Sequence, residues 1–366
     1  MKIPVYGQNA QNSHASENMA IILYPMLFLL GLWGCLAIYN STCYSEQPFH
    51  FAGRQFVWLL IGMLLLFLSS KIPFVLYKEG IFAIAAISYI PLIAVLAWGT
   101  QVNGMNGWFS WNGIFFQPSE FAKAPFLLLL CCVNARIEDE FRRFIALLGV
   151  TVLWMIPVAL QPDMGTCLIY FCGFFLVYWI GGGRIKYFFF SLAALLPILI
   201  FFMMRNPYIF SRFQGFLDPL ADPLGKGWHV MQFRYTLARG GFWGASWGKA
   251  VWANSYLPLA HSDSAFASLT ESVGFAGAFP VIAGIMIICL VACRMADRQT
   301  DKLRRTFIFC VPALFALQSL IHISVNLTIL PTTGITLPIL SYGGSSLVST
   351  MIAFGIFLSA ASRKDY

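Results

Sequence analysis

The stretch AIILYPMLFLLGLWGCLAIY, residues 20–39, carries no charged side chain. A helix that crosses a bilayer needs about 20 mostly apolar residues, and inside lipid its backbone must satisfy its own hydrogen bonds. The run is too long for the core of a signal peptide and has no convincing cleavage site after it. It therefore predicts a transmembrane helix, and similar runs recur along the chain.

The composition indicates that the whole chain is built this way. Of its 366 residues, 59% are hydrophobic and 10% are charged, whereas soluble domains carry about 25% charged residues. Long continuous apolar runs favour helices over a β-barrel. We predict an all-α polytopic membrane protein with about ten transmembrane helices and one large extracytoplasmic loop between the seventh and the eighth. The expected helices are residues 20–39, 55–70, 80–99, 119–134, 143–160, 165–182, 185–204, 264–293, 305–329 and 336–361.

The net charge of +8 does not indicate a nucleic-acid partner, because the basic residues lie in short connections between the apolar runs. Cytoplasmic loops of membrane proteins are enriched in lysine and arginine. We therefore expect a multi-pass protein of the bacterial cytoplasmic (inner) membrane with both termini in the cytoplasm. The basic connections and the tail contain Lys71, Lys78, Arg136, Arg142, Arg143, Arg184, Lys186, Arg294, Arg298, Lys302, Arg304, Arg305, Arg363 and Lys364.

This topology divides the chain into a cytoplasmic tail over residues 1–19, helices over 20–204, an outer loop over 205–262, helices over 263–361, and a tail over 362–366. The outer loop is too long to be a simple connector, which favours a functional or folded segment. Its stretch 228–241 has helical length and ends in two glycines, where a C-terminal cap is expected. We predict an amphipathic helix at the membrane interface, with Trp228 and Gln232 on one face and Phe233 on the other.

Ionisable side chains at membrane depth usually mark ligand or ion sites, and here they concentrate on the outer side. In QPSEFAK (117–123), Ser119 is a natural N-cap, and Glu120 and Lys123 are spaced to form an ion pair on one helix face. Asp163, in QPDMGT (161–166), either caps the following helix or serves a site. Arg54 is either an interfacial anchor or part of a phosphate clamp.

Two more segments combine polar groups with a turn. LPTTGITLPILSYGGSS (330–346) is broken by glycine and proline, and such backbone at membrane depth lines protein or a watery cavity. YLPLAHSD (256–263) ends at the start of an apolar run, where local rules make Ser262 or Asp263 an N-cap. Glu271 has no capping role, and His322 in the ninth helix is more typical of a packing histidine. The sequence contains no nucleotide-binding motif, so a transferase would need a lipid-carried donor and no nucleotide cofactor.

Taken together, the motifs QPSEFAK, QPDMGT, GFLDPLADPLGKGW, YLPLAHSD and GITLPILSYGGSS, in this order, resemble the SEDS family of FtsW/RodA peptidoglycan glycosyltransferases. The resemblance is closer to the FtsW division branch. It implies an inverting polymerisation of lipid II into glycan strands on the outer face of the membrane during septal wall synthesis. It also implies partners: a class B penicillin-binding protein, other divisome proteins and the nascent glycan. Ser264 and Ala265 are small where the family usually carries bulky residues.

The resemblance places the catalytic carboxylate at Asp263, which would act as general base toward the acceptor hydroxyl. Cations, and a divalent metal such as Mg or Mn held by Asp263, Glu120 or Asp163, would stabilise the departing pyrophosphate. The other readings are an elongation-type (RodA) polymerase, a lipid II flippase or transporter, and a structural scaffold. The predicted substrate- and pyrophosphate-binding residues are Arg54, Lys123, Glu120, Asp163, Arg212, Trp228, Gln232, His261, Ser341, Ser345 and Ser346.

Overall fold

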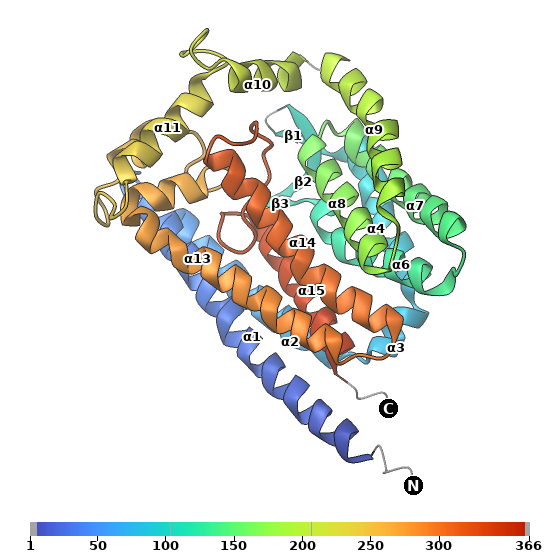
Figure 1. Ribbon diagram of the computed structural model, residues 1–366. Helices are drawn as coiled ribbons and strands as arrows, with labels where there is room; N and C mark the ends of the chain where they lie inside the picture. The colour runs from blue at the N-terminus through green and yellow to red at the C-terminus, as the bar shows by residue number, and fades with distance from the viewer. Residues whose placement is uncertain (1–5, 103, 206, 363–366) are drawn as a thin grey trace.

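The computed structural model describes residues 6–102, 104–205 and 207–362, so the basic tail residues Arg363 and Lys364 lie outside it. Helices dominate this part of the chain (Figure 1). In chain order they are α1 (Tyr6–Ser41), α2 (Phe49–Lys71), α3 (Phe74–Glu79), α4 (Ile81–Trp98), α5 (Pro118–Phe121), α6 (Lys123–Arg136), α7 (Glu140–Leu160), α8 (Met164–Ile180), α9 (Ile185–Arg205), α10 (Pro207–Leu217), α11 (Trp228–Gly240), α12 (Val251–Ser255), α13 (Ala265–Asp297), α14 (Lys302–Asn326) and α15 (Gly344–Ala361).

Each of the ten predicted apolar stretches contains a helix, which confirms the polytopic fold. Among the described residues, seven helices are long and apolar enough to cross a membrane, and α8 is a shorter apolar helix. Several boundaries differ from the prediction; α1 begins at Tyr6 and α2 at Phe49, before the predicted residues 20 and 55. The ninth helix ends at Asn326, and the tenth begins only at Gly344, so residues 327–343 form an irregular connection. Prolines and glycines prevent that connection from continuing either helix.

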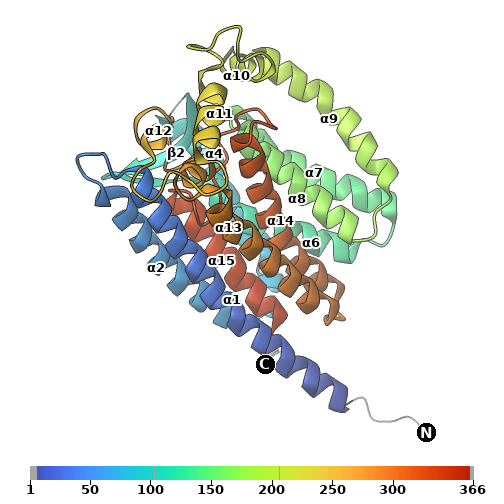
Figure 2. The same cartoon turned by 60° about the vertical axis from the view of Figure 1, so that its left-hand side comes forward.

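Helices far apart in sequence pack side by side, most extensively α2 with α15 and α1 with α13, and the consecutive helices α13 and α14 also pack closely (Figure 2). Small residues permit the close approach that is typical of membrane helices. A Cβ atom at Gly62 of α2 would come within 2.8 Å of Leu347, and one at Gly355 of α15 would come within 2.6 Å of the Leu66 carbonyl oxygen. The outward faces remain apolar, as on α4, where Ile87 is 69% exposed. Such faces suit contact with lipid chains.

A small antiparallel sheet between α4 and α5 was not predicted. Its strands are β1 (Thr100–Val102), β2 (Met105–Trp111) and β3 (Ile114–Phe116), in the order β1-β2-β3. Asn112 and Gly113, with φ of 49° and 78°, join β2 to β3. An Asn-Gly pair is the favoured two-residue hairpin turn because both positions adopt positive φ. The hairpin places aromatic side chains over one end of the helix bundle.

Residues 207–262 contain helices α10, α11 and α12, which arch across the same end of the bundle (Figure 1). As predicted, α11 ends at the glycine pair, where the amide of Gly241 donates to the Leu237 carbonyl at 3.1 Å. The predicted division of its faces was wrong, because Gln232 is buried together with Phe233 against α13. A break in α13 at Gly274, φ 67°, frees backbone groups that bond to the loop after α11. This pairing fixes α11 onto α13.

Candidate functional site

A cavity of about 590 Å³ opens at the end of the bundle covered by the hairpin and by α10. It collects groups from seven parts of the chain: the mouth of α2, the hairpin, the start of α5 and α6, the α7–α8 turn, α10, and the two irregular segments before α13 and α15. Its charged or hydroxyl-bearing lining includes Arg54, Glu120, Lys123, Asp163, Thr166, Arg212, Ser262, Asp263, Thr336 and Ser346. Seven of the predicted site residues therefore converge here, from Arg54 to Ser346.

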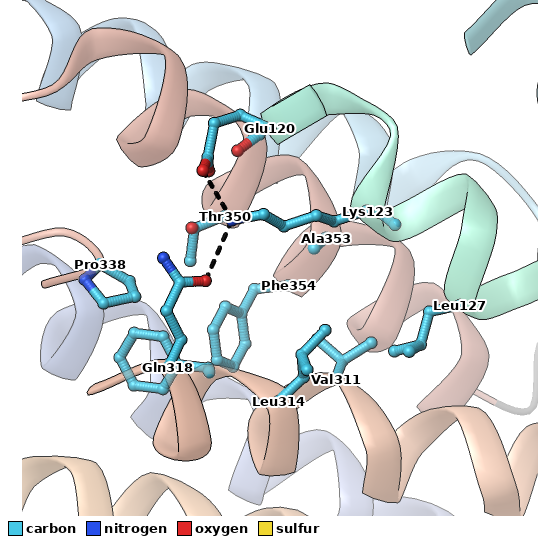
Figure 3. Close-up of a pocket in the computed structure, with 13 residues that line it drawn as sticks. Glu120, Lys123, Leu127, Val311, Leu314, Gln318, Pro338, Thr350, Ala353 and Phe354 are labelled. Atoms are coloured by element: carbon cyan, nitrogen blue, oxygen red, sulfur yellow. Dashed lines mark hydrogen bonds and ion pairs between the residues drawn. The ribbon is translucent and has the colours of Figure 1, made fainter. Parts of the chain in front are cut away.

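The predicted pair of Glu120 and Lys123 is confirmed and is deeply placed (Figure 3). The Lys123 ammonium donates to Glu120 Oε1 at 2.7 Å and to Gln318 Oε1 at 3.0 Å. Gln318, on α14, donates in turn to the Thr336 carbonyl at 3.3 Å. Ser119 does not cap the helix as predicted, because α5 begins at Pro118 and the Ser119 hydroxyl is buried without a partner among the described residues. The fixed ammonium borders the cavity.

Asp163 both caps α8 and lines the cavity, so its two predicted roles coexist. Its Oδ1 accepts from the Thr166 amide at 2.9 Å, and its Oδ2 accepts from the Thr166 hydroxyl at 2.7 Å. Gln117 Nε2 approaches Oδ2 at 3.4 Å. Burial raises the pKa of Asp163, although the two Thr166 bonds favour the ionised form. The carboxylate is thus rigidly held at the helix N-terminus.

Asp263 is not the N-cap that local rules predict. Helix α13 begins at Ala265, and its cap residue Ser264 makes no side-chain bond to it. Asn326, at the end of α14, supplies the cap instead. Its Oδ1 accepts from the Ala267 amide at 2.9 Å, and its Nδ2 donates to the Asp263 carbonyl at 3.0 Å. The Asp263 carboxylate therefore makes no capping hydrogen bond to α13, and it lines the cavity.

The surroundings of Asp263 combine burial with opposing charges. Burial raises the pKa of the Asp263 carboxyl, the Arg212 guanidinium acts to lower it, and the Asp163 carboxylate acts to raise it. Arg212 and Asp263 flank Gly334, where a Cβ atom would lie 4.0 Å from both Arg212 Nη1 and Asp263 Oδ2. Gly334 has φ of 73°, a conformation that glycine adopts without strain. The turn thus brings an acid and a cation together.

Arg54 is anchored to the hairpin, since its Nη2 donates to the Gly113 carbonyl at 2.7 Å. It remains on the cavity lining, so the phosphate-clamp role stays available to it. Ser346 also faces the cavity, where the Thr336 hydroxyl donates to its Oγ at 3.1 Å. Both residues therefore lie where the sequence predicted ligand contacts.

The other five predicted binding residues are not part of the cavity lining. Gln232 accepts from the Trp252 indole at 2.8 Å, and Trp228 begins the same helix α11. The Ser341 and Ser345 hydroxyls bond to backbone groups of the connection, α5 and β3. The His261 ring stacks on Phe51 with ring centroids 4.4 Å apart. Gln232, His261, Ser341 and Ser345 thus contact neighbouring segments of the protein.

Two residues that position the site were not identified in advance. Gln318 and Asn326, both on α14, were not among the predicted site residues. His322 fulfils its packing prediction, with Nδ1 2.8 Å from the Ile335 carbonyl oxygen. Polar residues on one face of an apolar helix, at positions 318, 322 and 326, were the available signal. Their spacing by four residues puts them on one side of α14.

No group of three Asp, Glu, His or Cys side chains capable of holding a metal ion occurs among the described residues. Magnesium, however, often binds through one or two carboxylates together with the phosphates of a substrate. Glu120 and Asp163 are already engaged with Lys123 and Thr166. Asp263 is therefore the predicted acidic ligand that best fits such a shared ion.

A bundle of membrane-length helices with a charged cavity at one end defines a polytopic membrane protein with a site for a charged ligand. The chain belongs to the FtsW/RodA/SpoVE family of cell cycle proteins, whose sequence profile matches residues 18–366. This confirms the resemblance carried by the five motifs.

Individual relatives agree with the family assignment. The chain is 30% identical to a probable peptidoglycan glycosyltransferase FtsW of Trichlorobacter lovleyi, over 93% of each chain. It is 32% identical to that of Tolumonas auensis, over 88% of this chain and 87% of the relative. A chain of a peptidoglycan synthase complex described as coordinating polymerization and crosslinking superimposes with a TM-score of 0.78 and 25% identity, covering 94% of this chain and 98% of that chain. The rod shape determining protein RodA of Thermus thermophilus shares the fold, with a TM-score of 0.71 and 23% identity over 95% of this chain and 97% of RodA.

Proposed function

We propose that this protein polymerises lipid II into glycan strands in the cavity, with Asp263 as general base. It is a peptidoglycan glycosyltransferase of the FtsW type, and the elongation-type alternative is less favoured because the FtsW relatives are the more similar ones. The observation that carries the catalytic assignment is the Asp263 carboxylate. Asn326 fixes its backbone, capping does not consume it, and it shares a cavity with three cations, Arg54, Lys123 and Arg212.

The chemistry follows from these groups. Asp263 accepts the proton of the acceptor sugar hydroxyl, whose oxygen then forms a bond to the anomeric carbon of the donor. The bond from that carbon to the pyrophosphate oxygen breaks on the opposite side, so the anomeric centre inverts. Arg54, Lys123 and Arg212 stabilise the charge that develops on the pyrophosphate. Asp263 would hold a divalent cation, which would supply Lewis-acid stabilisation of the charge on the leaving pyrophosphate.

The setting of this reaction is part of the proposal. Arg136, Arg142, Arg184 and Lys302 lie at helix ends away from the cavity, which supports a cytoplasmic position for that end and an outward-facing cavity in the inner membrane. A class B penicillin-binding protein and other divisome proteins are the proposed partners. The polymerization and crosslinking coordinated in the structurally similar synthase complex support this.

The test is polymer formation by purified protein supplied with fluorescent lipid II and a divalent cation, with and without the partner. Asp263→Asn should reduce glycan ladders by about 10²–10⁴-fold, the usual contribution of a general base. Its Tm should stay nearly unchanged, because the carboxylate does not cap α13. Asp218→Asn, at an exposed turn of the same outer segment, is the matched control. Normal polymerisation by Asp263→Asn refutes the assignment, whereas lipid II scrambling across vesicles without polymer favours a flippase.

A further inference from the structure

The end of the bundle opposite the cavity contains buried polar groups that the proposed reaction does not use. Helices α6 and α8 begin beside the cavity, at Lys123 and Met164, and run to this opposite end. Asn134, near the end of α6, is fully buried, and neither its Oδ1 nor its Nδ2 has a partner among the described residues. It lies against Gly181, just after α8. A buried amide with both polar atoms unpaired is costly and calls for a ligand.

Arg143, in the first turn of α7, is a second buried side chain with an unpaired polar atom, and it carries a positive charge. It is only 6% exposed, and its Nε is completely buried without a hydrogen-bond partner among the described residues. The two Nη nitrogens are not completely buried and have no hydrogen bond to the described residues either. A buried guanidinium without a counterion is strongly unfavourable. The accessible edge of Arg143 is the edge that a bidentate anion would contact.

The acidic residues around Arg143 are committed elsewhere. Asp139 caps α7 through the Arg142 amide at 2.8 Å. Glu140 pairs with Arg184 at 3.1 Å. Asp301 caps α14 through the Leu303 amide at 2.7 Å and the Arg304 amide at 3.3 Å. The described part of the chain therefore supplies no carboxylate within ion-pair distance of Arg143, and the counterion must come from outside it.

Nearby groups add to the attraction for an anion. Lys302, the first residue of α14, lies within electrostatic range of Arg143. The Tyr178 hydroxyl is also within range, but it already donates to Glu140 Oε1 at 3.1 Å. Two acidic groups oppose an anion here: Glu138, which is exposed and within range of Lys302, and Glu140, which pairs with Arg184 and accepts from Tyr178. We propose that Arg143, Asn134 and Lys302 form a binding site for an anionic phosphate group at the helix ends opposite the cavity. Because these basic helix ends form the side proposed to face the cytoplasm, the headgroup of an anionic phospholipid is the natural source of the phosphate.

Lipid binding to purified protein tests this inference, using Arg143→Met with Arg142→Met as the matched control. Both changes remove one positive charge from adjacent residues of α7, but Arg142 is exposed. The protein is held in a zwitterionic detergent and titrated with phosphatidylglycerol, while native mass spectrometry counts bound lipids and a melting curve gives Tm. Inorganic phosphate is titrated in a parallel series to distinguish a soluble anion from a headgroup.

We expect phosphatidylglycerol to raise the Tm of the unaltered protein by a few degrees and to bind as one retained lipid, because a ligand of the folded state stabilises it. Arg142→Met should respond equally, and Arg143→Met should lose both effects. Without any anion, Arg143→Met should melt no lower than the unaltered protein, since it removes an unpaired buried charge. A response to inorganic phosphate that Arg143→Met abolishes supports the site with a soluble anion as its ligand.

The inference is overturned if neither anion affects the unaltered protein, or if Arg143→Met responds as the unaltered protein does. Should Arg143→Met fail to fold, Arg143→Lys keeps the charge and loses the planar fork. Its affinity for phosphatidylglycerol should drop about tenfold, and an unchanged affinity contradicts the proposal. Failure here leaves polymerisation untouched, because these residues lie outside the catalytic cavity.

Discussion

Replacing Asn326 by leucine tests how the tertiary structure holds the proposed base. The Asn326 side chain accepts from the Ala267 amide at 2.9 Å and donates to the Asp263 carbonyl at 3.0 Å, and the residue is completely buried. Leucine occupies a similar volume but offers neither bond. The first turn of α13 then loses its cap, and the residue that carries the base loses its anchor to α14.

The size of the effect follows from these two bonds. Each buried backbone group left without a partner costs about 1–3 kcal/mol, so the two together destabilise the fold by about 2–6 kcal/mol. At roughly 2 °C per kcal/mol for a large domain, the apparent Tm should fall by roughly 4–12 °C. Polymerisation should fall further than stability alone requires, because a misplacement of about 1 Å at a reacting group costs about 10²-fold in rate.

The measurement combines melting curves in detergent with initial rates of glycan formation from fluorescent lipid II at a temperature where the variant is folded. Ser268→Ala is the matched control. The Ser268 hydroxyl is buried on α13, the helix that Asn326 caps, and has no hydrogen-bond partner among the described residues. This substitution should leave both quantities nearly unchanged. If Asn326→Leu melts and polymerises like the unaltered protein, Asn326 does not position Asp263.

Three other outcomes are expected. Burial raises the pKa of Asp263, and a general base works only when it is ionised. As the pH decreases, the rate of polymerisation should therefore begin to fall at a pH above the usual aspartate pKa of about 4. Arg212→Gln should raise the pH of this fall further, and a lower pH contradicts the assignment of Asp263 as the base. Gly334→Ala should impair polymerisation, because a side chain is strained at a φ of 73° and the turn that must adjust lies beside Arg212 and Asp263, whereas Gly248→Ala, equally strained at φ 74° but outside the cavity lining, should not. Gln318→Leu should lower kcat/KM about tenfold, since it removes a charge-assisted bond to the buried ammonium; an unchanged kcat/KM rules out that positioning role.

Local rules were sufficient wherever one stretch of chain determines its own structure. Apolar runs of membrane length became helices, because lipid leaves the backbone no other partners. The ion pair of Glu120 with Lys123, the capping of α8 by Asp163 and the glycine stop of α11 all join residues within a few positions of each other. For such contacts the spacing along the chain already fixes the distance.

The same rules were wrong where a distant segment competes. Ser119 and Asp263 both have the chemistry of an N-cap, yet α5 begins one residue before Ser119, and Asn326 from α14 caps α13. The hairpin of residues 100–116 was missed because its Asn-Gly turn lies within a segment that was treated only as a loop.

The sequence by itself determined a polytopic helical membrane protein of the FtsW/RodA/SpoVE family, with its acidic and basic candidates near one face. Only the tertiary structure decided which of those candidates meet. The bond from Lys123 to Gln318 spans 195 positions, and Arg212 of α10 and Asp263 before α13 both approach Gly334 in the connection after α14. Contacts between separate helices depend on how their faces pack, and no periodicity within one helix encodes the face that its neighbour presents.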